Sequence, residues 1–276
     1  MSLGEKIWYR WLKRPYILAV EEKVNDSKVM PVVFLHGLAS SSHVWDPVLD
    51  AMDGLAISNR RLTVDLLGFG ESPKPDWLAY NTDDHARMVI ATLVRRRVKK
   101  AVLVGHSMGC LIAVRVARLR PDLVKQLILY EMPLYSGLPD KRTYRIRLNL
   151  YFKFYERVIA YRPIFKGPGV GKAQKFAERV FGLKITDQTW RPFIKSLKHT
   201  IMQQTTSEDL KHIKAPMDVI YGSRDRVVIK GKTKALFGED ATNIQSYTVK
   251  ASHNVSKKAS LFIAQRIQAA VNGETL

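Results

Sequence analysis

A five-residue segment, Gly-His-Ser-Met-Gly at positions 105–109, constrains the fold of this chain more than any other feature. It follows an apolar run at 100–104 with the character of a buried strand, and it precedes an apolar helical run at 111–119. A strand that turns so tightly into a helix crowds the backbone on either side of the central serine, which is why glycine is required at both ends of the segment. The turn is expected to lift the Ser107 hydroxyl above the strand end and to aim the backbone N–H of Met108 at the place where an oxyanion would form.

Seven strand-like runs alternate with five helical runs along the chain. Most of the strand-like runs are short and apolar on both faces, which is typical of a parallel sheet that helices cover on both sides. The strand-like runs lie at 17–24, 31–36, 61–65, 100–104, 125–130, 217–221 and 244–249. The helical runs lie at 44–52, 82–97, 111–119, 232–237 and 255–271. This order predicts an α/β fold with a doubly wound, mostly parallel sheet.

The alternation stops between residues 132 and 210, where helical, basic and aromatic sequence replaces it. The first helical segment carries apolar residues at helical spacing: Leu148, Tyr151, Phe152, Tyr155 and Ile159. The helical segments are 145–162, 173–181 and 190–204. We expect an inserted helical lid, with most of its aromatic side chains in core packing and a few facing the pocket. The predicted domains are a first part of the α/β core at 1–131, the lid at 132–210 and a second part of the core at 211–276.

Composition narrows the location and the partners. The single cysteine, Cys110, excludes an internal disulfide and suits a reducing compartment, and we expect it to be a small buried helix residue. The chain has neither a secretory signal pattern nor an uncharged stretch of transmembrane length, so we expect a cytoplasmic protein. The formal net charge of +20 would attract anionic partners. The basic residues are spread along the chain without a nucleic-acid-binding motif, and no specific nucleic-acid recognition is expected.

The N-terminal segment 6–14 combines apolar and basic residues. Its apolar residues are Ile7, Trp8, Trp11 and Leu12, and its basic residues are Lys6, Arg10, Lys13 and Arg14. We expect an ordinary helix packed on the domain. The alternative is a short basic amphipathic helix that contacts an anionic membrane surface, which would make the protein peripheral at the membrane.

Two further residues complete a candidate catalytic group with Ser107. A serine hydroxyl is too weakly acidic to attack unaided, and it needs a base that a third group holds in the correct tautomer. Asp225 lies in the loop after the strand-like run at 217–221, and His253 lies in the loop after the run at 244–249. Ligand sites of α/β sheets collect at these strand ends. We place His85, by contrast, on a charged helix face.

Four motifs, each at the carboxyl end of a strand, give the chain a clear resemblance to the α/β-hydrolase superfamily. They are Leu35-His36-Gly37-Leu38, the segment 65–72 (Asp-Leu-Leu-Gly-Phe-Gly-Glu-Ser), the segment 105–109, and the loops of Asp225 and His253. The resemblance implies an oxyanion hole formed by the backbone N–H groups of Leu38 and Met108. It also implies that His36 and His106 are structural. Some relatives carry their acid at the position of Glu131, which is therefore the alternative to Asp225.

The resemblance implies a serine hydrolase that cleaves a small-molecule carboxylic ester through an acyl-enzyme, with no metal or organic cofactor. A serine at position 107 argues against relatives that use aspartate there, such as haloalkane dehalogenases and epoxide hydrolases. The aromatic and aliphatic lid suggests a moderately apolar substrate. A C–C bond hydrolase, a cofactor-free haloperoxidase-like enzyme and a non-catalytic binding protein of the same fold are the alternatives. Ser252 departs from the family pattern, which often has glycine directly before the catalytic histidine.

Overall fold

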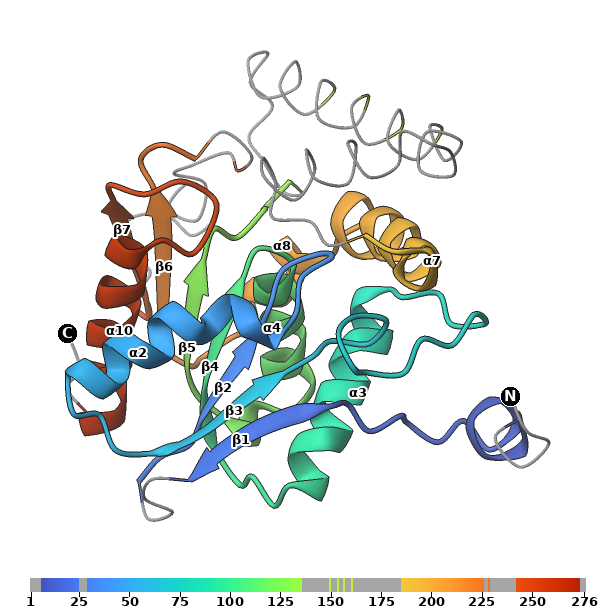
Figure 1. Cartoon of the computed structure of the whole chain (residues 1–276), viewed down its shortest axis with the longest axis horizontal. Helices are drawn as coiled ribbons and strands as arrows, with labels where there is room; N and C mark the ends of the chain where they lie inside the picture. Colours follow the sequence, from blue (N-terminus) through green and yellow to red (C-terminus); the bar gives the residue numbers. More distant parts are fainter. Residues whose placement is uncertain are drawn as a thin grey trace.

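A seven-stranded sheet forms the centre of the molecule (Figure 1). The computed structural model describes residues 6–24, 29–135, 185–225, 228 and 242–273, together with Asn149, Lys153, Glu156 and Ala160. The strand order is β1-β3-β2-β4-β5-β6-β7, and every neighbouring pair is parallel except β1 and β3. The predicted α/β fold with a mostly parallel sheet is confirmed.

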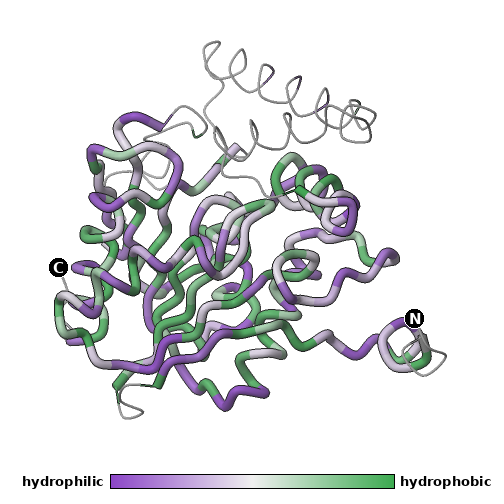
Figure 2. The backbone as a smooth tube through the Cα atoms, in the orientation of Figure 1, coloured by the Kyte–Doolittle hydropathy of each residue, from purple (hydrophilic) through white to green (hydrophobic). Residues whose placement is uncertain are grey.

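All seven predicted strand-like runs contribute a strand. The strands are β1 (Val20–Val24), β2 (Val32–Leu35), β3 (Arg60–Val64), β4 (Ala101–His106), β5 (Val124–Tyr130), β6 (Met217–Gly222) and β7 (Ile244–Val249). β2, β4 and β6 are buried along their whole length, and the centre of the sheet is correspondingly hydrophobic in Figure 2. β1 is shorter than its predicted run and runs antiparallel at one edge, where alternate residues face solvent.

Helices cover both faces of the sheet, and alternate residues of each central strand pack against one layer or the other. The layers consist of α2 (Asp46–Gly54) with α10 (Lys257–Asn272), and of α3 (Thr82–Arg95), α4 (Met108–Leu119) and α8 (Thr206–Leu210). In β4, for example, Leu103 packs with the α3 and α4 layer, whereas Val102 and Val104 pack with the α2 and α10 layer. Short turns of helix are η1 (Lys6–Trp11), η2 (Ser42–Trp45), η3 (Pro121–Leu123) and η5 (Leu197–Met202).

The described end of the predicted lid packs on the body of the molecule. α7 (Asp187–Ser196) begins with a capping box between Thr186 and Thr189 and continues into η5. Trp190 and Phe193 are buried in the same hydrophobic cluster as α3 and α4, as expected for aromatic side chains in core packing. The ring of His85 is fully buried, with Nε2 3.0 Å from Ser196 Oγ, so the prediction that His85 lies on a charged helix face was wrong.

Other parts of the predicted lid lie largely outside the described residues. Within 145–162, Asn149, Lys153, Glu156 and Ala160 are helical and exposed, and their spacing is that of one helix face. The apolar face of that segment and the predicted helices at 173–181 and 232–237 lie outside the described part of the chain. No described helix is both long and apolar enough to cross a membrane.

Candidate active site

Ser107 occupies the tight turn between β4 and α4. Its backbone has φ 52° and ψ −118°, a strained conformation for a residue with a side chain. The turn is held by a hydrogen bond from the Ser107 N–H to the carbonyl of Tyr130, 2.9 Å long. A Cβ on Gly105 would come within 2.8 Å of the backbone of Cys110, and a Cβ on Gly109 would clash with the carbonyl of Leu35. Both glycines are therefore required by close backbone approach, as the sequence predicted.

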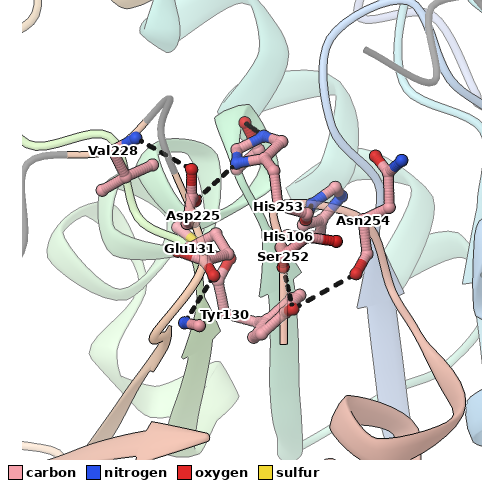
Figure 3. Close-up of polar contacts among 11 residues, drawn as sticks. His106, Tyr130, Glu131, Asp225, Val228, Ser252, His253 and Asn254 are labelled. Carbon is pink, nitrogen blue, oxygen red and sulfur yellow. Dashed lines mark hydrogen bonds and ion pairs between the residues drawn. The ribbon is translucent and has the colours of Figure 1, made fainter. Parts of the chain in front are cut away.

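The structure brings Ser107, His253 and Asp225 together. His253 Nδ1 lies 2.8 Å from Asp225 Oδ2, and His253 Nε2 lies 3.2 Å from Ser107 Oγ (Figure 3 shows the first of these contacts). A carboxylate can only accept, so Nδ1 carries the proton of a neutral imidazole and Nε2 is free to accept the serine proton. Asp225 Oδ1 also accepts from the backbone N–H of Val228 at 3.2 Å. The carboxylate of Asp225 is fully buried, which shields this contact from water.

Glu131 lies beside Asp225 (Figure 3), at the end of β5. Its side chain is fully buried, its φ is 54°, and its Oε1 accepts from the backbone N–H of Gly222 at 2.5 Å. Glu131, Asp225 and His253 each offer a ligand atom within 4.8 Å of the others, the distance range of a metal-binding group. Here, however, Asp225 and His253 already bind each other. The arrangement is thus suited to orienting the imidazole of His253, and the carboxylate of Glu131 lies nearby.

Two side chains hold the loop that carries His253. His106 Nε2 donates to the backbone carbonyl of His253 at 2.9 Å. The hydroxyl of Tyr130 donates to the carbonyl of Ser252 at 2.6 Å and lies 3.2 Å from that of Asn254. Burial lowers the pKa of His106 to about 3, so its ring is neutral and too weakly basic to serve as a second base. Sequence reasoning missed Tyr130, because a tyrosine at the end of a buried strand has the same pattern as a core residue.

His36 shapes the loop after β2 through two hydrogen bonds of its ring. Leu66 donates its backbone N–H to His36 Nε2 at 2.9 Å, and His36 Nδ1 donates to the carbonyl of Gly37 at 2.7 Å. Burial lowers the pKa of His36 to about 4, in agreement with a structural role. A Cβ on Gly37 would lie 3.2 Å from Ser107 Cβ, so this loop passes directly beside the serine.

Cys110 is a buried helix residue. Its Sγ lies 3.2 Å from the carbonyls of Gly105 and Tyr130, and burial raises the pKa of its thiol. A thiol in this environment stays protonated and unreactive. The residue contributes packing behind the turn that carries Ser107.

The chain is similar in sequence to known proteins. The model of a family described as the alpha/beta hydrolase family matches residues 32–261. A probable lysophospholipase, BODYGUARD 1 of Arabidopsis thaliana, is 34% identical over 132 residues, which cover 47% of this chain and 28% of that protein. A haloalkane dehalogenase of Bradyrhizobium diazoefficiens is 40% identical over 100 residues, which cover 36% of this chain and 31% of that protein.

Solved structures extend the likeness of fold to almost the whole chain. A thermophilic esterase from Thermogutta terrifontis has a TM-score of 0.67 and 19% sequence identity, with 94% of each chain covered. The match to the two sequence relatives, by contrast, spans less than a third of their length. The fold is therefore shared with the esterase over nearly the whole chain, whereas each sequence relative matches this chain over only part of its own length.

Proposed function

Since the chain belongs to the alpha/beta hydrolase family, we propose that it is a serine hydrolase that cleaves carboxylic esters. Ser107 is the proposed nucleophile, His253 the general base and Asp225 the acid that orients it. The observation that carries the proposal is the unbroken chain of contacts from Asp225 Oδ2 through His253 to Ser107 Oγ, at 2.8 and 3.2 Å. This sequence of acid, imidazole and hydroxyl is the arrangement that activates a serine for attack on a carbonyl.

The proposed reaction proceeds in two halves. As Ser107 Oγ attacks the ester carbonyl, His253 Nε2 takes the hydroxyl proton, and Asp225 stabilises the imidazolium that forms. His253 returns this proton to the leaving alcohol, and an acyl-enzyme remains on Ser107. Water then loses a proton to His253 as it attacks the acyl group, and the proton finally returns to Ser107 as the carboxylic acid leaves.

The oxyanion is proposed to bind to the backbone N–H groups of Met108 and Leu38. Met108 is the first residue of α4, a helix of 12 residues, and the aligned peptide dipoles of a helix favour negative charge at its N-terminus. The loop after β2, which passes beside Ser107, supports the second donor. Removal of one such donor typically costs on the order of a hundredfold or more in rate.

The chemistry of Ser107 favours ester cleavage over dehalogenation. If a serine hydroxyl displaced a halide from a saturated carbon, the product would be an ether, which has no carbonyl for water to attack. A carboxylate nucleophile gives an ester in the same step and can turn over. A C–C bond hydrolase could use the same three residues and remains the second candidate for substrates that carry a carbonyl beside the cleaved bond.

We propose a moderately apolar ester with an anionic group as the substrate class. The relatives named as probable lysophospholipases and the charge of +20 both support this class, since a lysophospholipid joins one acyl chain to a phosphate. The insertion at 132–210 is the proposed lid that selects the acyl chain. Its described residues lie beside α3 and α4.

The test compares the wild type with Ser107→Ala. The wild type should hydrolyse p-nitrophenyl esters in a chain-length-dependent way and should react with a fluorophosphonate probe at Ser107, and the variant should do neither. Halide release from a bromoalkane is the parallel assay for dehalogenation. Halide release without ester hydrolysis would overturn the proposal, as would ester hydrolysis that Ser107→Ala retains. A folded wild type that acts on no substrate and takes up no probe would support a binding protein instead.

A further inference from the structure

The N-terminal turn of helix, η1, presents its apolar side chains to solvent. The exposed fractions are 46% for Ile7, 51% for Trp8, 80% for Trp11 and 46% for Leu12. A helix that packed on the domain through its apolar residues would bury these four side chains, and here they are exposed. Figure 1 shows η1 at the end of an extended segment, set apart from the sheet and its covering helices.

The segment is nevertheless attached to the domain, through a different face. The ring of Tyr9 stacks on Tyr16, with centroids 3.8 Å apart, and Tyr16 in turn lies 5.9 Å from the ring of Trp77. The backbone N–H of Tyr16 donates to the sulfur of Met88 on α3. The apolar residues are therefore exposed although η1 itself is held on the domain. They form a second face on an element whose first face is docked.

Positive charge surrounds this apolar face. The sequence from 6 to 20 contains Lys6, Arg10, Lys13 and Arg14 and no acidic residue. Arg10, Lys13 and Arg14 are exposed, and none of them forms an ion pair with another described residue. The guanidinium of Arg14 lies over the ring of Trp8 at 5.7 Å, which keeps a cation and an aromatic ring together at the surface.

We propose that η1 and the residues up to Arg14 form a docking surface for an anionic phospholipid bilayer. Tryptophan suits the boundary between lipid headgroups and acyl chains, because its ring is apolar at one end and polar at the other. Lysine and arginine beside it attract anionic headgroups through their positive charge. This mixture of apolar and polar residues is visible along η1 in Figure 2.

Other partners fit the surface less well. A second copy of this chain would bring a like net charge of +20 against the same basic face, and the two copies would repel each other. The phosphates of a nucleic acid could pair with the basic residues and its bases could stack on the tryptophans, but it offers no apolar environment for Ile7 and Leu12. A bilayer accommodates both the charge and the aliphatic side chains. The docking surface does not depend on the hydrolase activity.

The experiment is sedimentation of the full chain with vesicles. Vesicles of phosphatidylcholine and phosphatidylglycerol in similar amounts are compared with phosphatidylcholine alone. The wild type should bind the anionic vesicles and much less of the neutral ones. Trp8→Ser/Trp11→Ser should weaken binding to the anionic vesicles by more than about tenfold. Binding to the anionic vesicles should weaken to a similar extent in the charge variant Arg10→Gln/Lys13→Gln/Arg14→Gln. Added salt should also weaken this binding, since the Debye length falls to about 3 Å at 1 M.

A matched variant, Val94→Ser/Leu261→Ser, removes two exposed apolar side chains on α3 and α10, with exposed fractions of 52% and 46%. It should bind vesicles as the wild type does, and thermal unfolding should show every variant to be folded. Binding that survives the tryptophan substitutions would overturn the proposal. A wild type that binds no anionic vesicle would overturn it as well. If the wild type were then found to dimerise and the tryptophan variant did not, the partner would be a second copy of this chain.

Discussion

The side chain of His106 holds the backbone of His253, the candidate catalytic base: the Nε2–H of His106 donates to the carbonyl of His253 across 2.9 Å. Because a carbonyl can only accept, this contact fixes the proton of His106 on Nε2. The rings of the two histidines lie 5.2 Å apart, and the burial of His106 keeps its ring neutral. The residue before the serine thus positions the base that is proposed to serve it.

Substitution of His106 tests this positioning role. His106→Ala removes the donor and should lower kcat on the order of a hundredfold with little change in KM, because small displacements of a reacting group have effects of that size. His106→Gln keeps an N–H donor and should recover part of the loss. Rates are to be divided by the number of sites that a fluorophosphonate probe titrates. A loss of active sites with an unchanged rate per site would show that His106 acts on folding alone.

Asp225 and Glu131 give a second prediction. Asp225→Asn removes the carboxylate that holds His253 Nδ1, and in a serine triad such a change costs about 10⁴ in kcat. Here the carboxylate of Glu131 lies within 4.8 Å of the histidine ligand atom, so the loss should be smaller, about 10²-fold to 10³-fold. The double variant Asp225→Asn/Glu131→Gln should fall to the level of Ser107→Ala.

The single variant Glu131→Gln is the control for that pair. An amide at this position retains an oxygen to accept from Gly222, so the single variant should remain folded and active within about tenfold. Double-variant activity equal to that of Asp225→Asn would show that Glu131 does not support His253. An inactive Glu131→Gln with an active Asp225→Asn would exchange the roles of the two acids.

Much of the fold and the candidate site was predictable because the signals are local. The strand before Ser107 and the helix after it follow from apolar runs of the appropriate length, and the glycines around the serine follow from its backbone geometry. Asp225 and His253 followed from their positions at strand ends, since parallel strands carry their ligand residues to one edge. The geometry of the three residues agrees with that expectation.

What could not be predicted depends on contacts between distant segments. His85 is surrounded by charged residues in the sequence, yet its ring is buried because α7 supplies Ser196 as a partner more than a hundred positions away. Tyr130 supports the loop of His253 from another strand. The exposure of Trp11 was equally hidden, because amphipathic spacing shows that a helix has an apolar face but not whether the domain covers it.

The backbone around Ser107 gives a third prediction, which uses two glycines. A Cβ on Gly109 would clash with the carbonyl of Leu35 and lie 2.7 Å from that of His36, and backbone atoms cannot turn aside. Gly109→Ala should therefore lower the free energy of unfolding by about 3 kcal/mol and abolish activity. A Cβ on Gly54, at the end of α2, meets nothing within 4 Å. Gly54→Ala should be neutral or stabilising by up to about 1 kcal/mol. Unfolding in urea measures the free energy of unfolding of both variants. Equal changes in the two variants would contradict the close approach of the Leu35 carbonyl to Gly109.

The buried histidines predict how stability depends on pH. Burial lowers the pKa to about 4 for His36, about 3 for His85 and about 3 for His106, against 6.5 for the ordinary side chain. Between pH 6.5 and about 4 the unfolded chain therefore binds protons that the folded chain does not. The stability that these neutral rings contribute is complete above pH 6.5 and is lost as the pH falls. Near pH 5.5 the three residues together should take up close to three protons on unfolding.

His85→Gln isolates one of these protons away from the candidate site. Glutamine does not titrate and can still bond to Ser196, so the variant should lose stability less steeply below pH 6.5, by about one proton per molecule. The measurement is the free energy of unfolding in urea at closely spaced pH values from about 7.5 to about 5. This range spans the ordinary histidine pKa of about 6.5. His199→Gln serves as the comparison, because this half-buried histidine of η5 lies outside the buried core and, among the described residues, its ring bonds only to Gln203. If His85→Gln follows the wild type throughout this range, the pKa of His85 is not lowered in the folded protein, and its ring takes up a proton there as it does in the unfolded chain.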